Sequence, residues 1–101
     1  MALRKIASAR GVPEGSGKKI VVGGKTLALF KVGGKFYCVD GECPHRGGPL
    51  YEGSVEGAEL VCPWHGSRFD LATGQLKGGP AAGGIRSYRV RVVADDVMAE
   101  I

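Results

Sequence analysis

Pairs of glycine residues separate short apolar segments in the first half of the chain, and this punctuation constrains the fold most strongly. Gly23–Gly24 lies between segments 19–22 and 26–32, and Gly33–Gly34 lies between segments 26–32 and 35–39. Glycine adopts positive φ without steric cost, so two-residue glycine connections are typical of tight β-hairpin turns. The first half of the chain therefore predicts successive antiparallel strands joined by short turns.

Shorter segments continue this pattern to the end of the chain. Residues 55–61 and 68–77 each predict a hairpin, residues 85–93 predict one half-buried strand by their alternation, and residues 97–101 predict a last strand. No window shows the 3.6-residue period of an amphipathic helix. Because 101 residues leave room for one core, we expect residues 1–101 to form a single all-β domain, an antiparallel barrel or sandwich.

The net charge of +4 is unevenly distributed. Residues 1–36 carry eight Lys or Arg and one Glu, whereas residues 37–75 carry two Arg and six carboxylates. A basic chain invites comparison with nucleic-acid-binding proteins, but no row of aromatic side chains accompanies the lysines to stack on bases. The lysines lie beside glycine turns and alternate with apolar residues, as on the solvated face of a sheet. We therefore expect no nucleic-acid partner.

Neither the start of the chain nor its cysteines point to a membrane or to export. No segment reaches the roughly 18 apolar residues that a membrane span needs, and no apolar stretch of a secretory signal follows Arg4 and Lys5. Three cysteines cannot form a disulfide framework. We expect a cytoplasmic protein with no membrane partner, in which Cys38 is a small buried side chain with a free thiol.

Two segments depart from the strand pattern, and they hold both histidines and two of the three cysteines. The first reads CPHRGG from residue 43, and the second reads CPWHGS from residue 62. Proline and glycine shape tight turns, and loops on a rigid scaffold commonly carry ligands. The candidate ligands of a metal site are therefore Cys43, His45, Cys62 and His65.

Two kinds of metal site fit two cysteines and two histidines. A structural zinc ion takes four such ligands, but zinc sites usually pair Cys with Cys and His with His along the sequence. A binuclear iron–sulfur centre can place two cysteines on one iron and two histidines on the other. The mixed order of this chain favours the iron–sulfur centre. A zinc-stabilised binding module is the alternative of a different functional class.

The two segments resemble the cluster-binding boxes of Rieske-type ferredoxins, the ferredoxin components of ring-hydroxylating dioxygenase systems. The resemblance covers CPHRG at 43–47, CPWHGSRFD at 62–70, the loop at 78–80 and the strand at 87–90. It extends from Val32 to the C-terminus. It implies an antiparallel β barrel or sandwich with a small inserted cluster-binding subdomain.

That inserted subdomain would occupy about residues 41–73. The resemblance implies one [2Fe–2S] cluster, with Cys43 and Cys62 on the inner iron and His45 and His65 on the outer iron. In the family the two histidines lie half exposed at the tip of the protein, where the electron leaves. Pro80 would belong to a loop that covers the cluster.

The resemblance implies a one-electron carrier and not an enzyme. Both histidines are used as cluster ligands, so none is left for the mononuclear iron of an oxygenase, and no GxGxxG motif offers a nicotinamide site. The implied partners are a flavin-dependent reductase as donor and a terminal oxygenase as acceptor. A nitrite reductase, whose small subunit looks similar, is the alternative system. Trp64, between two ligands, is expected to pack beneath its loop, and docking or electron exit is the alternative role.

Four positions bear on the reduction potential. Two histidine ligands leave the oxidised core neutral, which raises the potential from about −400 mV to between roughly −150 and +300 mV. High-potential relatives carry a disulfide at the positions of Gly48 and Trp64 and a tyrosine hydroxyl at the position of Phe69. Only their serine, here Ser67, is retained. Because hydrogen bonds to sulfur raise the potential, we expect the lower half of the range.

Overall fold

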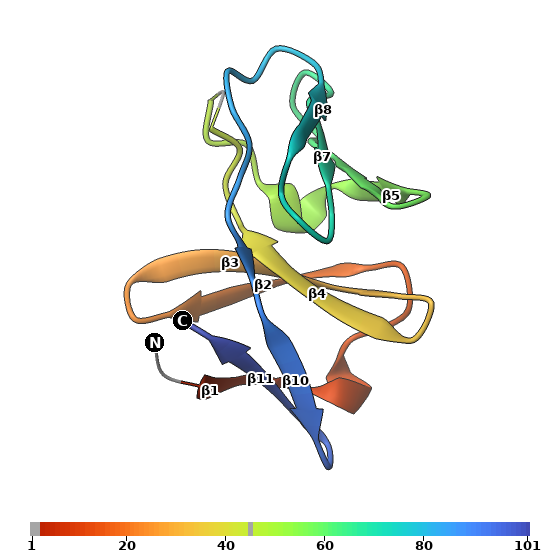
Figure 1. Ribbon diagram of the computed structural model, residues 1–101, viewed down its shortest axis with the longest axis vertical. Helices are drawn as coiled ribbons and strands as arrows, with labels where there is room; N and C mark the ends of the chain where they lie inside the picture. The colour runs from red at the N-terminus through yellow and green to blue at the C-terminus, as the bar shows by residue number, and fades with distance from the viewer. Residues whose placement is uncertain (1–2, 45) are drawn as a thin grey trace.

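Three small antiparallel sheets make up the protein in the computed structural model, which describes residues 3–44 and 46–101 (Figure 1). The strands are β1 (Leu3–Ser8), β2 (Gly17–Val22), β3 (Lys25–Val32), β4 (Lys35–Asp40), β5 (Ser54–Glu56), β6 (Glu59–Val61), β7 (Arg68–Asp70), β8 (Leu76–Gly78), β9 (Ser87–Tyr88), β10 (Val90–Val93) and β11 (Asp96–Glu100). The first sheet has the order β1-β11-β10, the second β2-β3-β4-β9 and the third β5-β6-β7-β8. The prediction of an all-β antiparallel fold is confirmed.

The described residues also form two short 3-10 helices, η1 (Ala9–Gly11) and η2 (Leu50–Glu52). Among these residues, no helix has the length and apolar character needed to cross a membrane. Both glycine pairs form the predicted hairpin turns, since φ is positive at Gly23 and Gly24 and again at Gly33 and Gly34.

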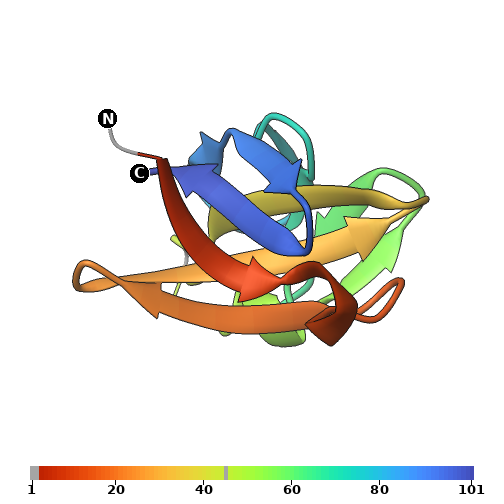
Figure 2. The ribbon, with the colours of Figure 1, turned by 90° about the horizontal axis from the view of Figure 1, so that it is seen from below.

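Strand β3 lies between two cores, because both of its faces are buried. Ala28 and Phe30 belong to a core shared with the third sheet, whereas Leu27 and Leu29 belong to a core shared with the first sheet. Side chains alternate along a strand, so a continuous apolar run fills both cores at once. Figure 2 shows the strands of the first sheet crossing those of the second. The second sheet is thus the middle layer of the molecule.

The third sheet is an insertion between β4 and β9, which are paired neighbours in the second sheet. In Figure 1 it lies at one end of the molecule, with the first sheet at the other. The second and first sheets together are called the body below. The insertion's sheet continues to Gly78, beyond the expected limit of about residue 73, because β8 pairs with β7.

The prediction of one half-buried strand at 85–93 is wrong, since the strand begins at Ser87, is interrupted at Arg89 and leaves Val92 and Val93 exposed. Strand β9 pairs with β4 in the second sheet, and β10 pairs with β11 in the first sheet. The chain changes sheets at this point, and alternation alone does not reveal such a crossing. The pattern also does not predict β1, which pairs with β11.

Candidate metal centre

Two loops of the insertion bring the candidate cysteines into contact. Cys43 follows β4 and Cys62 follows β6, and each is 2% exposed within one core. Burial raises the pKa of the Cys62 thiol, while the backbone N–H of Trp64, which donates to it, acts in the opposite direction. The Cys43 side chain lies close enough to the Cys62 thiol to raise its pKa further. Two adjacent buried sulfurs are the arrangement that two thiolate ligands of one metal ion require.

Each loop closes on itself at its cysteine. The Cys43 N–H donates to the Gly48 carbonyl at 2.8 Å, and the Cys62 N–H donates to the Ser67 carbonyl at 2.8 Å. His65 has φ 68°, a left-handed conformation that is uncommon for residues other than glycine. The turn leaves His65 exposed, on the same loop as the buried Cys62. The loop that contains Cys62 and His65 thus holds its sulfur inside the protein and its imidazole at the surface.

Gly48 allows the two loops to approach closely. A Cβ atom at this position would lie 2.9 Å from the Cys62 Sγ and 3.3 Å from the Trp64 Cβ. Such a contact is shorter than carbon and sulfur tolerate, so any larger residue would displace one loop. The space beside the sulfurs is therefore kept open by the absence of a side chain.

A third segment packs on the second loop through Ser67. Of the polar and charged residues that the structure describes, only Ser67 is fully buried. Its Oγ accepts a hydrogen bond from the Ala81 N–H at 3.1 Å. A hydroxyl has one proton to donate, and this bond leaves that proton available for another acceptor. A Cβ on Gly79 would lie 2.5 Å from the Ser67 Cα, so the segment around Pro80 rests directly on this loop.

The four predicted ligands differ in where the structure places them. The structure brings Cys43 and Cys62 together and exposes His65, while His45 lies outside the described residues. No three Cys, His, Asp or Glu side chains of residues 3–44 and 46–101 gather around one point as a metal site. Trp64 is 48% exposed, so the expectation that it packs beneath its loop is wrong.

Cys38 lies apart from the two ligand loops. It is 1% exposed and belongs to the core on the opposite side of the second sheet. Burial, together with the charge of Asp40, raises the pKa of its thiol to about 12. The prediction that Cys38 is a small buried side chain with a free thiol is confirmed.

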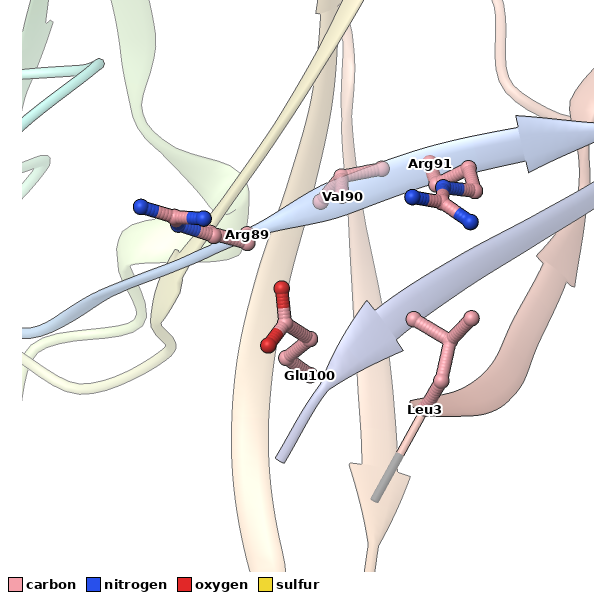
Figure 3. Close-up of a pocket in the computed structure, with 5 residues that line it drawn as sticks. All are labelled: Leu3, Arg89, Val90, Arg91 and Glu100. Atoms are coloured by element: carbon pink, nitrogen blue, oxygen red, sulfur yellow. The ribbon is translucent and has the colours of Figure 1, made fainter. Parts of the chain in front are cut away.

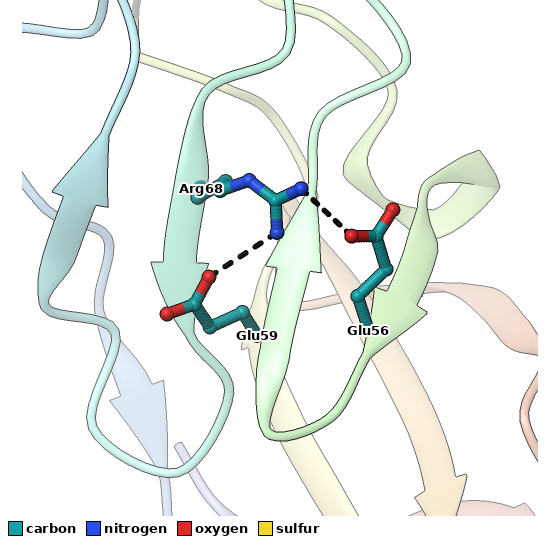
Figure 4. A network of polar contacts seen from close by, with 3 residues as sticks. All are labelled: Glu56, Glu59 and Arg68. Atoms are coloured by element: carbon teal, nitrogen blue, oxygen red, sulfur yellow. Dashed lines mark hydrogen bonds and ion pairs between the residues drawn. The ribbon is translucent and has the colours of Figure 1, made fainter.

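The surface of the insertion is braced by one arginine across three strands. Arg68 on β7 contacts Glu56 on β5 at 2.7 Å and Glu59 on β6 at 3.3 Å (Figure 4). These ion pairs raise the pKa of the guanidinium, and the hydrogen bond that Arg68 donates to Glu56 contributes most. Exposed pairs of this kind stabilise a protein little. Sequence reasoning did not single out Arg68 as part of a network.

The body carries a groove of about 460 Å³ that is lined by residues of β1, β10 and β11 and by Arg89. Figure 3 shows the side chains of Arg89, Arg91 and Glu100 around it, with Leu3 and Val90. It contains no Cys or His, and the ligand loops do not line it. The candidate metal centre is therefore a feature of the loops and not of this groove.

A comparison with protein families shows to which family the chain belongs. Residues 3–89 match the family model described as the Rieske [2Fe-2S] domain. The chain belongs to this family. The prediction of a Rieske-type [2Fe–2S] protein is therefore confirmed, and the buried thiol pair, the open space at Gly48 and the buried Ser67 hydroxyl are compatible with such a cluster.

Relatives of this Rieske protein are named as carriers. The ferredoxin component of a naphthalene 1,2-dioxygenase system from Pseudomonas aeruginosa is 37% identical over 90 residues, which cover 89% of this chain and 86% of the relative. The Sphingomonas yanoikuyae B1 ferredoxin has a TM-score of 0.91 and 27% identity, covering 99% of each chain. A chain in a complex of reduced oxygenase and oxidised ferredoxin of carbazole 1,9a-dioxygenase has a TM-score of 0.86 and 29% identity, covering 96% of this chain and 91% of that chain. The prediction of an electron carrier in place of an enzyme is confirmed by these relatives.

Proposed function

We propose that Cys43 and Cys62 bind one iron of the [2Fe–2S] cluster and that His45 and His65 bind the other. The observation that carries this assignment is the contact between the two buried thiols. The exposure of His65 supports the assignment of the outer iron. When bound, the cluster accepts and releases one electron. The protein's own residues exclude water from the sulfur side and leave the imidazole side accessible.

The exposed end of the insertion is the proposed surface for electron exchange. Trp64 is 48% exposed beside His65, and the neighbouring Pro63 and Gly66 are also exposed. Large aromatic side chains that are exposed on a monomer often anchor protein interfaces. A partner that covers Trp64 would bring its own redox centre close to the His65 imidazole.

At the level of the system, we propose that residues 1–101 act as one Rieske domain that relays electrons from a flavin-dependent reductase to a terminal oxygenase. The names of the relatives and the ferredoxin–oxygenase complex support this role. The free thiol of Cys38 supports the proposed cytoplasmic location. The alternative acceptor is a nitrite reductase, and reconstitution with each system would distinguish them by which one receives electrons.

The ligand set can be tested with the three cysteines as matched variants. Iron and sulfide content and the EPR spectrum of the reduced protein would be measured for Cys43→Ala, Cys62→Ala and Cys38→Ala. We expect the first two variants to lose the cluster and Cys38→Ala to retain it. His65→Ala should also lose the Rieske EPR signal. A zinc-containing, colourless wild-type protein would overturn the proposal in favour of a structural metal site.

A further inference from the structure

One carboxylate holds both chain crossings that join the insertion to the body. Asp40 ends β4 just before the first ligand loop, and Arg86 precedes β9, where the chain returns. The Asp40 N–H donates to the Arg86 carbonyl at 3.0 Å, and the Arg86 N–H donates to the Asp40 Oδ2 at 2.9 Å. The other oxygen, Oδ1, accepts the Tyr88 hydroxyl at 2.7 Å. Both carboxylate oxygens are thus used across 46 and 48 residues of sequence.

The Tyr88 hydroxyl is a persistent donor in this arrangement. Burial and the hydrogen bond to Asp40 raise the pKa of Tyr88 to about 12. The phenol therefore stays protonated at neutral pH and continues to donate. The Lys25 ammonium lies 5.8 Å from the centre of the Tyr88 ring and covers it from β3. Hydrogen bonds to an ionised acceptor are stronger than those between neutral groups.

The same two crossings lead directly to the cluster-binding loops. Two residues, Gly41 and Glu42, separate Asp40 from Cys43 along the chain. On the other side, residues 79–86 form a strap that is held at Ser67 by the Ala81 N–H and at Gly74 by the Ile85 N–H, at 2.8 Å. Asp40 fastens the end of this strap. Its carboxylate therefore links the loop that carries one sulfur to the segment that orients the buried Ser67 hydroxyl.

We propose that Asp40 is a positioning residue for the cluster, which it holds in place by fastening the strap 79–86 and the first ligand loop to each other through Arg86 and Tyr88. This inference rests on the proposed ligand set. Loss of the carboxylate would leave the Arg86 N–H and the Tyr88 hydroxyl without their acceptor. The strap and the loop would then move independently, and the contact between Ala81 and Ser67 would weaken.

The test compares Asp40→Ala, Asp40→Asn and Tyr88→Phe with Asp95→Asn as control. Asp95 also accepts a backbone N–H, that of Arg10 at 3.2 Å, but it does so within the body. Midpoint potential, EPR g values and the rate of cluster bleaching in mild denaturant would be measured in the intact protein. Amide hydrogen exchange at Arg86 would be measured in the protein with and without the cluster.

In Asp40→Ala, we expect the cluster to bleach about fivefold faster than in the wild-type protein. The Arg86 amide should also exchange about fivefold faster. Asp40→Asn should recover part of this loss, because its amide oxygen can still accept from Tyr88. We expect Tyr88→Phe to have a lower potential and altered g values. Because this substitution changes no charge at neutral pH, both effects would report geometry alone. Asp95→Asn should match wild type in potential, g values and Arg86 exchange.

Wild-type potential, g values and bleaching in both Asp40→Asn and Tyr88→Phe would overturn the inference, even if Asp40→Ala failed to fold. Equal effects of Asp95→Asn would also overturn it, because they would show a general loss of stability. A wild-type protein without the Rieske EPR signal would instead overturn the ligand set. The failures of the two proposals are therefore distinguishable.

Discussion

The Oγ of Ser67 accepts a hydrogen bond from the Ala81 N–H at 3.1 Å inside the protein, where the serine is fully buried. This contact joins the second ligand loop to the strap that returns the chain to the body. It also determines the direction in which the hydroxyl proton remains free to donate.

Ser67→Ala is expected to lower the reduction potential, because the buried Ser67 hydroxyl is the group that we expect to donate to a cluster sulfur. It should also reduce the free energy of unfolding by about 1–3 kcal/mol, since the Ala81 N–H becomes unsatisfied. Redox titration and urea unfolding would measure both effects. Ser54→Ala, at an exposed position of β5, is the control and should change neither. An unchanged potential in Ser67→Ala would contradict the role of its hydroxyl.

The wild-type potential should lie in the lower half of the range of Rieske centres, nearer to about −150 mV than to +300 mV. Phe69 is fully buried and has no hydroxyl to donate, and Gly48 and Trp64 cannot form a disulfide. A spectroelectrochemical titration followed by visible absorbance measures this value directly. A midpoint above about +200 mV would refute the prediction.

Gly48→Ala is expected to separate the two ligand loops. The new methyl group would meet the Cys62 Sγ at 2.9 Å, and overpacking of this kind costs roughly 1–3 kcal/mol. We expect lower iron content after purification and a lower melting temperature. Gly83→Ala is the matched control, because a Cβ there meets nothing within 4 Å. Full iron content in Gly48→Ala would show that the loops can yield.

Trp64→Ala is expected to slow electron transfer to the acceptor without changing the potential. Truncation of an aromatic anchor commonly costs about 2 kcal/mol or more of binding, which corresponds to about a 30-fold weaker complex. Stopped-flow reoxidation by the terminal oxygenase would show this effect in its dependence on acceptor concentration. Val21→Ala, at a residue of β2 that is 65% exposed, controls for loss of a surface apolar group.

Alkaline pH should destabilise the protein through two buried or partly buried groups. The pKa of Cys38 is raised from 9.0 to about 12 and that of Tyr88 from 10.0 to about 12, in both cases mainly by burial. A raised pKa contributes stability that is complete below the unfolded value and is lost as pH rises to the folded value. Urea unfolding between pH 8 and 12 should therefore show falling stability above about pH 9. Cys38→Ala should show a smaller decline, and an identical decline would contradict this assignment.

The ligand loops could be predicted from the sequence because their chemistry is local. Cys62 and His65 stand within one tight turn, and proline and glycine mark its shape. The position of Asp40 could not be predicted in this way. Its partners are 46 and 48 residues distant, and no pattern in the sequence connects them. The hairpins at the glycine pairs were predictable for the same reason as the loops, since each turn is local.

Interruptions of regular structure were less predictable than the structure itself. Residues 85–93 alternate as one strand would, but the chain leaves the second sheet after Tyr88 and enters the first sheet at Val90. Alternation reports which side of a strand is buried and does not report which sheet buries it. The exposure of Trp64 was likewise not predictable, because an aromatic residue between two ligands suits either a core or an interface.

Both faces of β3 are buried, and each face belongs to a different core. Phe30 belongs to the core that contains Cys43 and Cys62, and Leu29 belongs to the core beneath the first sheet, so the two cores share the backbone of β3 but no buried side chain. The core beneath the first sheet can therefore be repacked without replacing any side chain of the core around the two sulfurs. The insertion leaves the body after β4 and returns at β9, and because these two strands pair, both of its connections lie at one point of attachment.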